Sequence, residues 1–220
     1  MRWKAVLLAL AMIAGAVYLD SVSGAAPRPR VIPEAWQLNF IYSNPRAIRL
    51  KLQGQEEPQT FWYMIYTVIN QTGEDRRFRP EFVLYTQSGD LHRAGWGVRA
   101  GAFSTIKKLH NEPLLRATVS GKLLQGEDNA KHGVAIWPDF DPQSETADIF
   151  IGGLSGETAD VTLPKPIKKV IRTRKGETKT IIKTKITLSR TLQLRFKFAG
   201  GVGSRHLNPP TLVDATWVMR

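Results

Sequence analysis

Ile182 to Phe198 reads IKTKITLSRTLQLRFKF, and this stretch decides the fold. Its even-numbered positions are apolar except Thr184 and Arg190, whereas its odd-numbered positions carry Lys, Thr, Ser, Gln or Arg. Because side chains alternate between the two faces of a β-strand, this period of two predicts a strand with one packed face and one basic, hydroxylated face. The pattern fits one long strand, or two strands separated by a bulge near Ser189 and Arg190.

The residues on either side extend this strand into a sheet. Residues 168–175 are a candidate hairpin partner for it, with Gly176 and Glu177 in the turn. Residues 215–219 are expected to form one more strand. The sequence therefore predicts a long basic hairpin over residues 165–198, close to the C-terminus.

Period-two patterns recur upstream, in residues 36–42, 48–52 and 78–84. Residues 61–69, FWYMIYTVI, are apolar throughout, which is typical of a central strand covered on both faces. Two shorter strands are expected at residues 134–137 and 149–151. Gly152 and Gly153 follow, and they indicate a bulge or a close approach of two backbones. Many short strands separated by turn signals favour an all-β, antiparallel β-sandwich of immunoglobulin-like type, with a partly closed barrel as the alternative.

One stretch has a helical pattern. Residues 103–111, FSTIKKLHN, place Phe103, Ile106, Leu109 and His110 on one side, with Ser104 as a possible N-cap. Pro113 is expected to end this short helix.

The N-terminal residues have the layout of a secretory signal peptide. Arg2 and Lys4 precede the apolar run AVLLALAMIAGAVYL, and small residues then suit cleavage after Ala25. The run is short for a membrane span, which needs about 20 residues. We therefore expect residues 1–25 to be a signal peptide, 26–33 a linker and 34–220 a single domain. The expected location is periplasmic or extracellular, and an uncleaved N-terminal membrane anchor facing outward is the alternative.

The formal net charge of +12 is concentrated near the C-terminus. Residues 26–164 contain 15 Lys or Arg and 16 Asp or Glu, whereas residues 165–220 contain 14 and 2. An argument from charge to a partner therefore concerns the last quarter of the chain.

The sequence excludes several kinds of chemistry. It contains no Cys, which rules out disulfides, a Cys nucleophile, an iron–sulfur site and a Cys-ligated zinc site. The four His residues lack zinc-motif spacing. Gly153-Leu154-Ser155-Gly156 fails the Gly-x-Ser-x-Gly motif because Glu157 follows it. We expect no catalytic residue, no metal and no cofactor.

Two pairs of acidic residues on expected loops leave weaker alternatives open. Asp139 and Asp141 are spaced so that both carboxylates could reach one calcium ion. The same pair, or Glu127 and Asp128, could serve an exported hydrolase if the carboxylates converged in a cleft. Carboxylates exposed on turns are the simpler interpretation of all four residues.

Three segments carry a resemblance: FWYMIYTVINQTGEDRRF (61–78), GKLLQGEDNAKHGVAIWPDFDP (121–142) and IFIGGLSGE (149–157). The chain resembles a family of exported bacterial β-rich proteins that contain these blocks and have no assigned activity. The resemblance covers most of residues 34–160 together with Trp217-Val218-Met219-Arg220. It implies an exported β-rich domain, it supplies no site residue, and it does not extend to the basic region at 165–190.

Two functional hypotheses follow. The first is a non-catalytic exported domain for protein interaction or scaffolding in the cell envelope, in which the 182–198 strand is an exposed edge. The second is a module that binds anionic lipid or acidic polysaccharide through its basic face. Nucleic acid is not an expected partner, because the protein is exported and because Phe196 and Phe198 fall on the packed face. The candidate anion-binding residues are Arg172, Arg174, Lys175, Lys179, Lys183, Lys185, Arg195 and Lys197.

Overall fold

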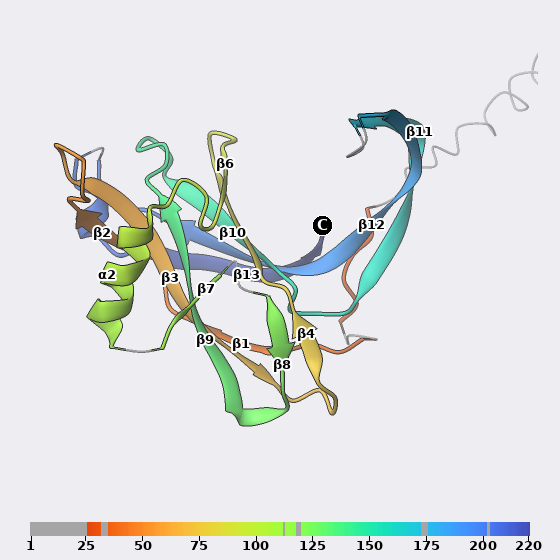
Figure 1. Cartoon of the computed structure of the whole chain (residues 1–220), viewed down its shortest axis with the longest axis horizontal. Coiled ribbons are helices and arrows are strands. Elements are labelled where there is room, and N and C mark those ends of the chain that lie inside the picture. The colour runs from red at the N-terminus through yellow and green to blue at the C-terminus, as the bar shows by residue number, and fades with distance from the viewer. Residues whose placement is uncertain (1–25, 32–34, 112, 118–119, 173–175, 202) are drawn as a thin grey trace, which may run out of the picture.

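The computed structural model describes residues 26–31, 35–111, 113–117, 120–172, 176–201 and 203–220, so the expected signal peptide lies outside the described residues. Strands dominate these residues, and they form antiparallel sheets (Figure 1). The prediction of an antiparallel, mostly β fold with one α-helix is confirmed for this part of the chain.

The first sheet has five strands. β3 (Gln59–Asn70) lies at its centre and pairs with β1, β2 and β9, while β9 also pairs with β7 through the short parallel register of Leu115 with Gly133. The other bounds are β1 (Asn39–Tyr42), β2 (Arg46–Leu50), β7 (Leu115–Arg116) and β9 (Gly126–Pro138).

The second sheet has six strands and is built around β12. This strand pairs with β11 and β10 along one edge and with β13 along the other, and the sheet continues from β10 to β5 and β6. A separate pair joins β4 to β8. The bounds are β4 (Arg76–Phe78), β5 (Glu81–Thr86), β6 (Leu91–Arg93), β8 (Gly121–Leu123), β10 (Thr146–Gly152), β11 (Thr158–Arg172), β12 (Thr178–Lys197) and β13 (Thr211–Met219).

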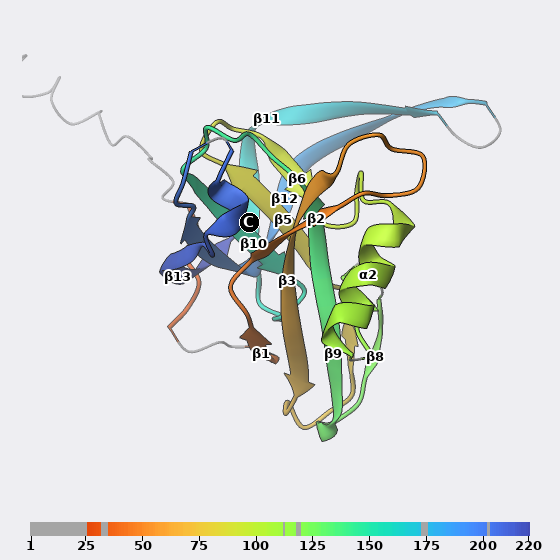
Figure 2. The same cartoon turned by 90° about the vertical axis from the view of Figure 1, so that its left-hand side faces the viewer.

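The two larger sheets bury one hydrophobic core between them. Trp62, Met64 and Trp137 from the first sheet belong to the same buried cluster as Ile149 and Leu194 from the second. The opposite face of β3 and β9 packs on the helix α2 (Ala100–His110), which lies beside them in Figure 2. β3 is therefore covered on both sides, which is why residues 61–69 are apolar without alternation.

The period-two prediction for residues 182–198 is confirmed where β12 belongs to the body of the protein. Leu192, Leu194, Phe196 and Phe198 are buried on its even face. The alternative with a bulge near Ser189 and Arg190 is wrong, because β12 runs continuously through this point. What changes there is the partner on one edge, which is β11 up to Ser189 and β10 from Leu192 onward.

The helix differs from its prediction at both ends. It begins at Ala100 rather than Phe103, and Ser104 is not its cap, because its hydroxyl donates to the carbonyl of Ala100 inside the helix. The helix ends at His110, and Asn111 caps it in a left-handed conformation with φ of 48°. Leu109, expected on the packed side, is 62% exposed.

Residues 78–84 form two strands and not the single strand predicted. Phe78 ends β4 and Glu81 begins β5, and these strands belong to different sheets. Pro80 lies between them and has no N–H to donate to a sheet ladder. The predicted close backbone approach at Gly153 is confirmed, because a Cβ there would lie 2.2 Å from the carbonyl oxygen of Arg79.

Gly153 offers a test of this close approach. Its φ is +85°, so Gly153→Ala forces both a left-handed Ala and a clash with the Arg79 backbone. Gly73→Ala is the matched control, because Gly73 has a φ of +87° and open space around its Cβ position. In urea denaturation we expect the control to lose about 1 kcal/mol and Gly153→Ala to lose about 2 kcal/mol more. Equal losses would contradict the close approach.

Candidate functional site: a basic β-ribbon

β11 and β12 continue beyond the body of the protein as a two-stranded ribbon. Figures 1 and 2 both show the two strands leaving the other strands together. Their pairing runs from Thr158 with Ser189 to Arg172 with Thr178, with a register shift between Thr162 and Ile167. The predicted hairpin is thus confirmed for the described residues, with a partner strand that begins at Thr158 rather than at residue 168. Residues 173–175 of the predicted partner lie outside the described residues, and Gly176 adopts a φ of +84°.

One face of the ribbon combines lysine with isoleucine. Cross-strand partners in a sheet lie on the same face, and here lysine pairs with isoleucine three times in succession. The pairs are Lys183 with Ile167, Lys169 with Ile181, and Lys179 with Ile171. Lys185 lies two residues beyond Lys183 and shares the same face. We call Lys169, Lys179, Lys183 and Lys185, with these three isoleucines, the lysine face.

The cationic groups of the ribbon have no anionic partners in the described structure. Four of them lie in β11 and three in β12, whereas residues 158–172 and 176–189 contain two acids, Asp160 and Glu177. The Asp160 carboxylate accepts a hydrogen bond from the Thr187 hydroxyl at 2.7 Å. Across the described ranges, none of the seven side chains makes an ion pair. Alternate residues of a strand are about 7 Å apart, which is within the screening length of about 8 Å at physiological salt. Their positive potentials therefore add. The seven are Lys165, Lys168, Lys169, Arg172, Lys179, Lys183 and Lys185.

The structure divides the predicted anion-binding residues into groups. Lys179, Lys183 and Lys185 lie together on the lysine face, whereas Arg172 pairs with Thr178 on the opposite face. Arg174 and Lys175 lie outside the described residues. The sequence did not single out Lys169, although its place in the hairpin partner could have indicated it.

Arg195 and Lys197 are separated from this group, because β12 carries them into the body. The Arg195 guanidinium donates to both oxygens of Asp148, at 2.8 and 3.1 Å. The hydrogen bonds to Asp148 raise the pKa of Arg195, and the attraction of the Asp148 charge is the second cause. Its charge is therefore neutralised locally, unlike the charges of the ribbon.

A buried ion pair fixes the root of the ribbon. Arg190 lies on the packed face of β12 and donates to Glu157 at 2.7 Å, and the two side chains are only 6% and 10% exposed. Arg190 also donates to the carbonyl of Arg30, and its guanidinium lies over the Trp217 ring at 4.8 Å. The N–H of Arg30 donates to the other Glu157 oxygen, so part of the expected linker is held here. The Arg30 hydrogen bond and then the Arg190 ion pair lower the pKa of Glu157.

The residues proposed for calcium are engaged by an arginine. Arg205, in a short 3-10 helix (Arg205–Leu207), donates to Asp139 Oδ1 at 2.9 Å and to the carbonyl of Asp141 at 2.7 Å. Asp139 Oδ1 also accepts from the Trp62 indole at 2.8 Å. The N–H of Gln143 donates a hydrogen bond to the Asp141 carboxylate, and this bond is the largest of several causes that lower the pKa of Asp141. Within the described ranges, no three His, Asp or Glu residues gather as they would around a metal ion.

The other acidic pair does not lie on a loop. Glu127 and Asp128 belong to β9, which corrects the prediction of a polar loop there. The two pairs lie at opposite ends of this strand. At about 3.3 Å per residue they are roughly 40 Å apart, so all four carboxylates cannot share one cleft.

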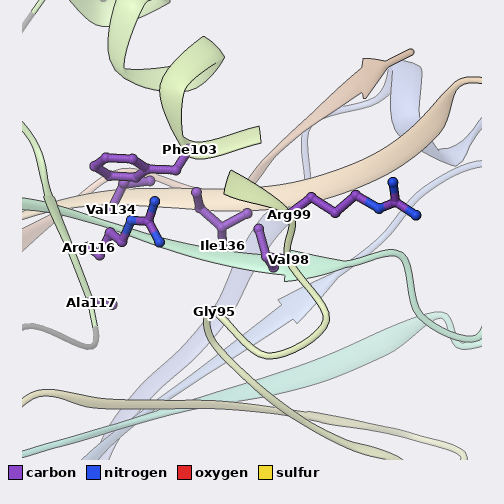
Figure 3. A pocket seen from close by; sticks show the side chains of 8 residues that line it. All are labelled: Gly95, Val98, Arg99, Phe103, Arg116, Ala117, Val134 and Ile136. Carbon is purple, nitrogen blue, oxygen red and sulfur yellow. The ribbon is translucent and has the colours of Figure 1, made fainter. Parts of the chain in front are cut away.

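A small pocket lies near the helix (Figure 3). It has a volume of about 60 Å³ and lies between α2, β9 and the turn at Gly95. The Arg116 guanidinium lies over the Phe103 ring at 4.6 Å, whereas Arg99 extends away from the other side chains in Figure 3. The pocket is too small for an extended ligand, so it does not define the site.

No protein-family model matches this chain, and neither a curated protein nor a solved structure matches it. The resemblance to exported bacterial proteins stays a prediction. Within the described residues, no helix has both the length and the apolar character needed to cross a membrane.

The Glu157–Arg190 pair gives a pH-dependent prediction. Because the folded-state pKa of Glu157 is lowered, its contribution is present above the unfolded-state pKa and is lost as the pH falls through the folded-state value. We expect Glu157→Gln to lower the free energy of unfolding by about 3 kcal/mol at pH 7, since Arg190 is left buried without its anion. The deficit relative to wild type should shrink progressively below pH 4.

Glu81→Gln is the matched control for this experiment. Glu81 faces Arg93 at 3.9 Å, and both side chains are more than half exposed. Its loss should stay below about 1 kcal/mol, because solvent screens exposed ion pairs. A Glu157→Gln deficit that is independent of pH, measured by urea denaturation from pH 3 to 7, would contradict the role of the ion pair.

Proposed function

We propose that this protein is a non-catalytic exported binding module, and that the lysine face of its ribbon docks on an anionic lipid bilayer. The observation that carries the proposal is the group of four lysines, without ion pairs among the described residues, on a ribbon that projects from the body. Juxtamembrane basic residues contribute about 1 kcal/mol each to binding of anionic membranes.

The isoleucines favour lipid over acidic polysaccharide. Ile167 on the lysine face is 51% exposed, although it is a large aliphatic residue. Lysine stems can lie along apolar surface while their ammonium groups reach the headgroups. A bilayer interface accepts both kinds of side chain, whereas a hydrated polysaccharide offers nothing apolar for isoleucine. Binding to acidic polysaccharide alone is therefore an outcome that the experiment must separate.

The wider setting is part of the same proposal. An immunoglobulin-like sandwich is the arrangement we propose for the body, supported by two antiparallel sheets that enclose one core. The periplasm or the extracellular space is the proposed location, on the strength of residues 1–25, with an uncleaved anchor as the alternative. A hydrolase using the acidic pairs has less support, because Asp139 is bonded to Arg205 and lies far from Glu127.

Protein interaction or scaffolding is the second candidate function. The supporting observation is that, in the described structure, residues 178–188 of β12 pair with β11 alone, and β11 pairs only with β12. Both strands of the ribbon therefore present an edge to which another strand can add. Such pairing depends on backbone hydrogen bonds and would persist at high salt, unlike docking through lysine.

Removing charge from the lysine face tests the lipid proposal. Lys179, Lys183 and Lys185 are changed together to Gln, and binding to anionic and neutral vesicles is measured by co-sedimentation. We expect affinity for vesicles with anionic headgroups to fall roughly a hundredfold, since three charges of about 1 kcal/mol each are lost. Wild-type binding should also weaken as the salt concentration rises.

The matched control changes Lys51, Lys107 and Lys108 to Gln, which alters the net charge equally away from the ribbon. All six side chains are exposed, so circular dichroism and thermal midpoints should match wild type for both variants. Equal weakening in the two variants would show a general charge effect and would refute docking by the ribbon. Binding to polygalacturonate with none to anionic vesicles would overturn the choice of lipid.

A further inference from the structure

A second pocket lies on the inner face of the first sheet, where the β4–β8 pair covers it. Its volume is about 230 Å³, and both strands of this pair contribute lining residues. Most of its lining is apolar or aromatic, which is typical of small-molecule sites. Two polar groups at this pocket have no role in the fold described above. The lining residues are Tyr66, Phe78, Leu115, Gly121, Lys122, Leu123 and Lys131.

The first polar group is the hydroxyl of Tyr66. This residue is only 3% exposed, and its ring packs against Phe82 with centroids 4.7 Å apart. The hydroxyl end of the ring crosses Gly133, where a Cβ would lie 2.4 Å from the oxygen. Throughout the described residues, this hydroxyl has no hydrogen-bond partner. Burial raises the pKa of Tyr66 far above its ordinary value, so the group remains a neutral donor at physiological pH.

The second polar group is the ammonium of Lys131. In the β3–β9 register Lys131 pairs with Val68 and Gly133 pairs with Tyr66. Residues two apart share a face, so Lys131 and the Tyr66 ring lie on the same side of the sheet. Among the described side chains, Lys131 has no ion-pair partner. Lys122 differs, because its ammonium is bound to Asp75 at 2.8 Å.

We propose that this pocket binds a small apolar molecule that ends in one carboxylate. The apolar part lies among Phe78, Leu115 and Leu123, and the carboxylate accepts hydrogen bonds from the Tyr66 hydroxyl and the Lys131 ammonium. A carboxylate can accept hydrogen bonds from both donors, and its negative charge is opposite to that of lysine. An amine would repel Lys131, and an alcohol would leave its charge without a partner. The site is independent of the lipid proposal for the ribbon.

Octanoate is the probe that tests this proposal. It is added to the purified protein, and methyl signals of Leu115 and Leu123 are followed by NMR. We expect saturable shifts with octanoate and much weaker binding of 1-octanol. Tyr66→Phe and Lys131→Gln should each weaken octanoate binding about tenfold, because each removes one hydrogen bond to the charged group.

Two further variants keep the test decisive. Lys122→Gln has the same charge change as Lys131→Gln but removes a lysine already bound to Asp75, so octanoate binding should stay near wild type. Gly121→Leu should abolish binding by filling the pocket. The Cβ position of Gly121 is in open space, and its cross-strand partner Phe78 lines the pocket on the same face.

The outcomes divide clearly. Saturable octanoate binding that Gly121→Leu abolishes and Lys131→Gln weakens supports the site. Equal binding of octanol and octanoate would overturn the carboxylate, and equal weakening by Lys122→Gln and Lys131→Gln would overturn the role of Lys131. The absence of saturable methyl shifts in wild type would overturn the site itself. None of these results depends on vesicle binding, so the two proposals can fail separately.

Discussion

The ion pair between Arg190 and Glu157 is the constraint on which the position of the ribbon depends. It lies where the partner of β12 changes from β11 to β10. It therefore fixes β11 and β12 at the point where the ribbon joins the rest of the second sheet. Two buried charges cost several kcal/mol of desolvation, and only a nearly complete set of partners offsets this cost. Glu157 accepts from Arg190 and from the Arg30 backbone, while Arg190 also reaches the Arg30 carbonyl. The buried Nε of Arg190 has no hydrogen-bond partner in the described structure.

A second buried arginine stabilises the loop between β9 and β10. Arg205 is 3% exposed, and its guanidinium lies over the Phe140 ring at 4.3 Å and the Trp62 ring at 5.5 Å. It donates to carbonyls of Phe140 and Asp141, so it binds the loop backbone as well as a carboxylate. Both buried arginines thus bind the backbone of a connecting segment, and their guanidinium groups are not available to a ligand. The ribbon lysines and Lys131 differ from them, because these cations make no ion pair among the described residues.

The sequence predicted the strands well where the burial of apolar side chains alone determines the pattern. Alternation identified β12 because its even side chains enter the core, and the unbroken run at 61–69 identified β3 because the helix covers its second face. Prediction failed where a polar side chain has a distant partner. Arg190 interrupts the apolar parity of β12, and only Glu157, far away in the sequence, explains it. The same holds for Asp139, whose partner Arg205 follows 66 residues later. Arg195 and the ribbon lysines share a parity, but only the structure shows that Asp148 neutralises one and leaves the others free.

The ribbon gains little stability from its own contacts. Two strands exposed on both faces are marginally stable in water, and the sheet of the body stops where the ribbon starts. Repulsion among its lysines opposes folding further, because the described ribbon contains only two acids, Asp160 and Glu177, against seven cationic side chains. An anionic surface would relieve this repulsion, and burial of Ile167 would add to the effect. Any partner that relieves the repulsion and buries Ile167 stabilises the folded ribbon by mass action. Binding of the partner and folding of the ribbon are therefore thermodynamically linked. The buried ion pair at the root then determines where the bound surface lies relative to the body.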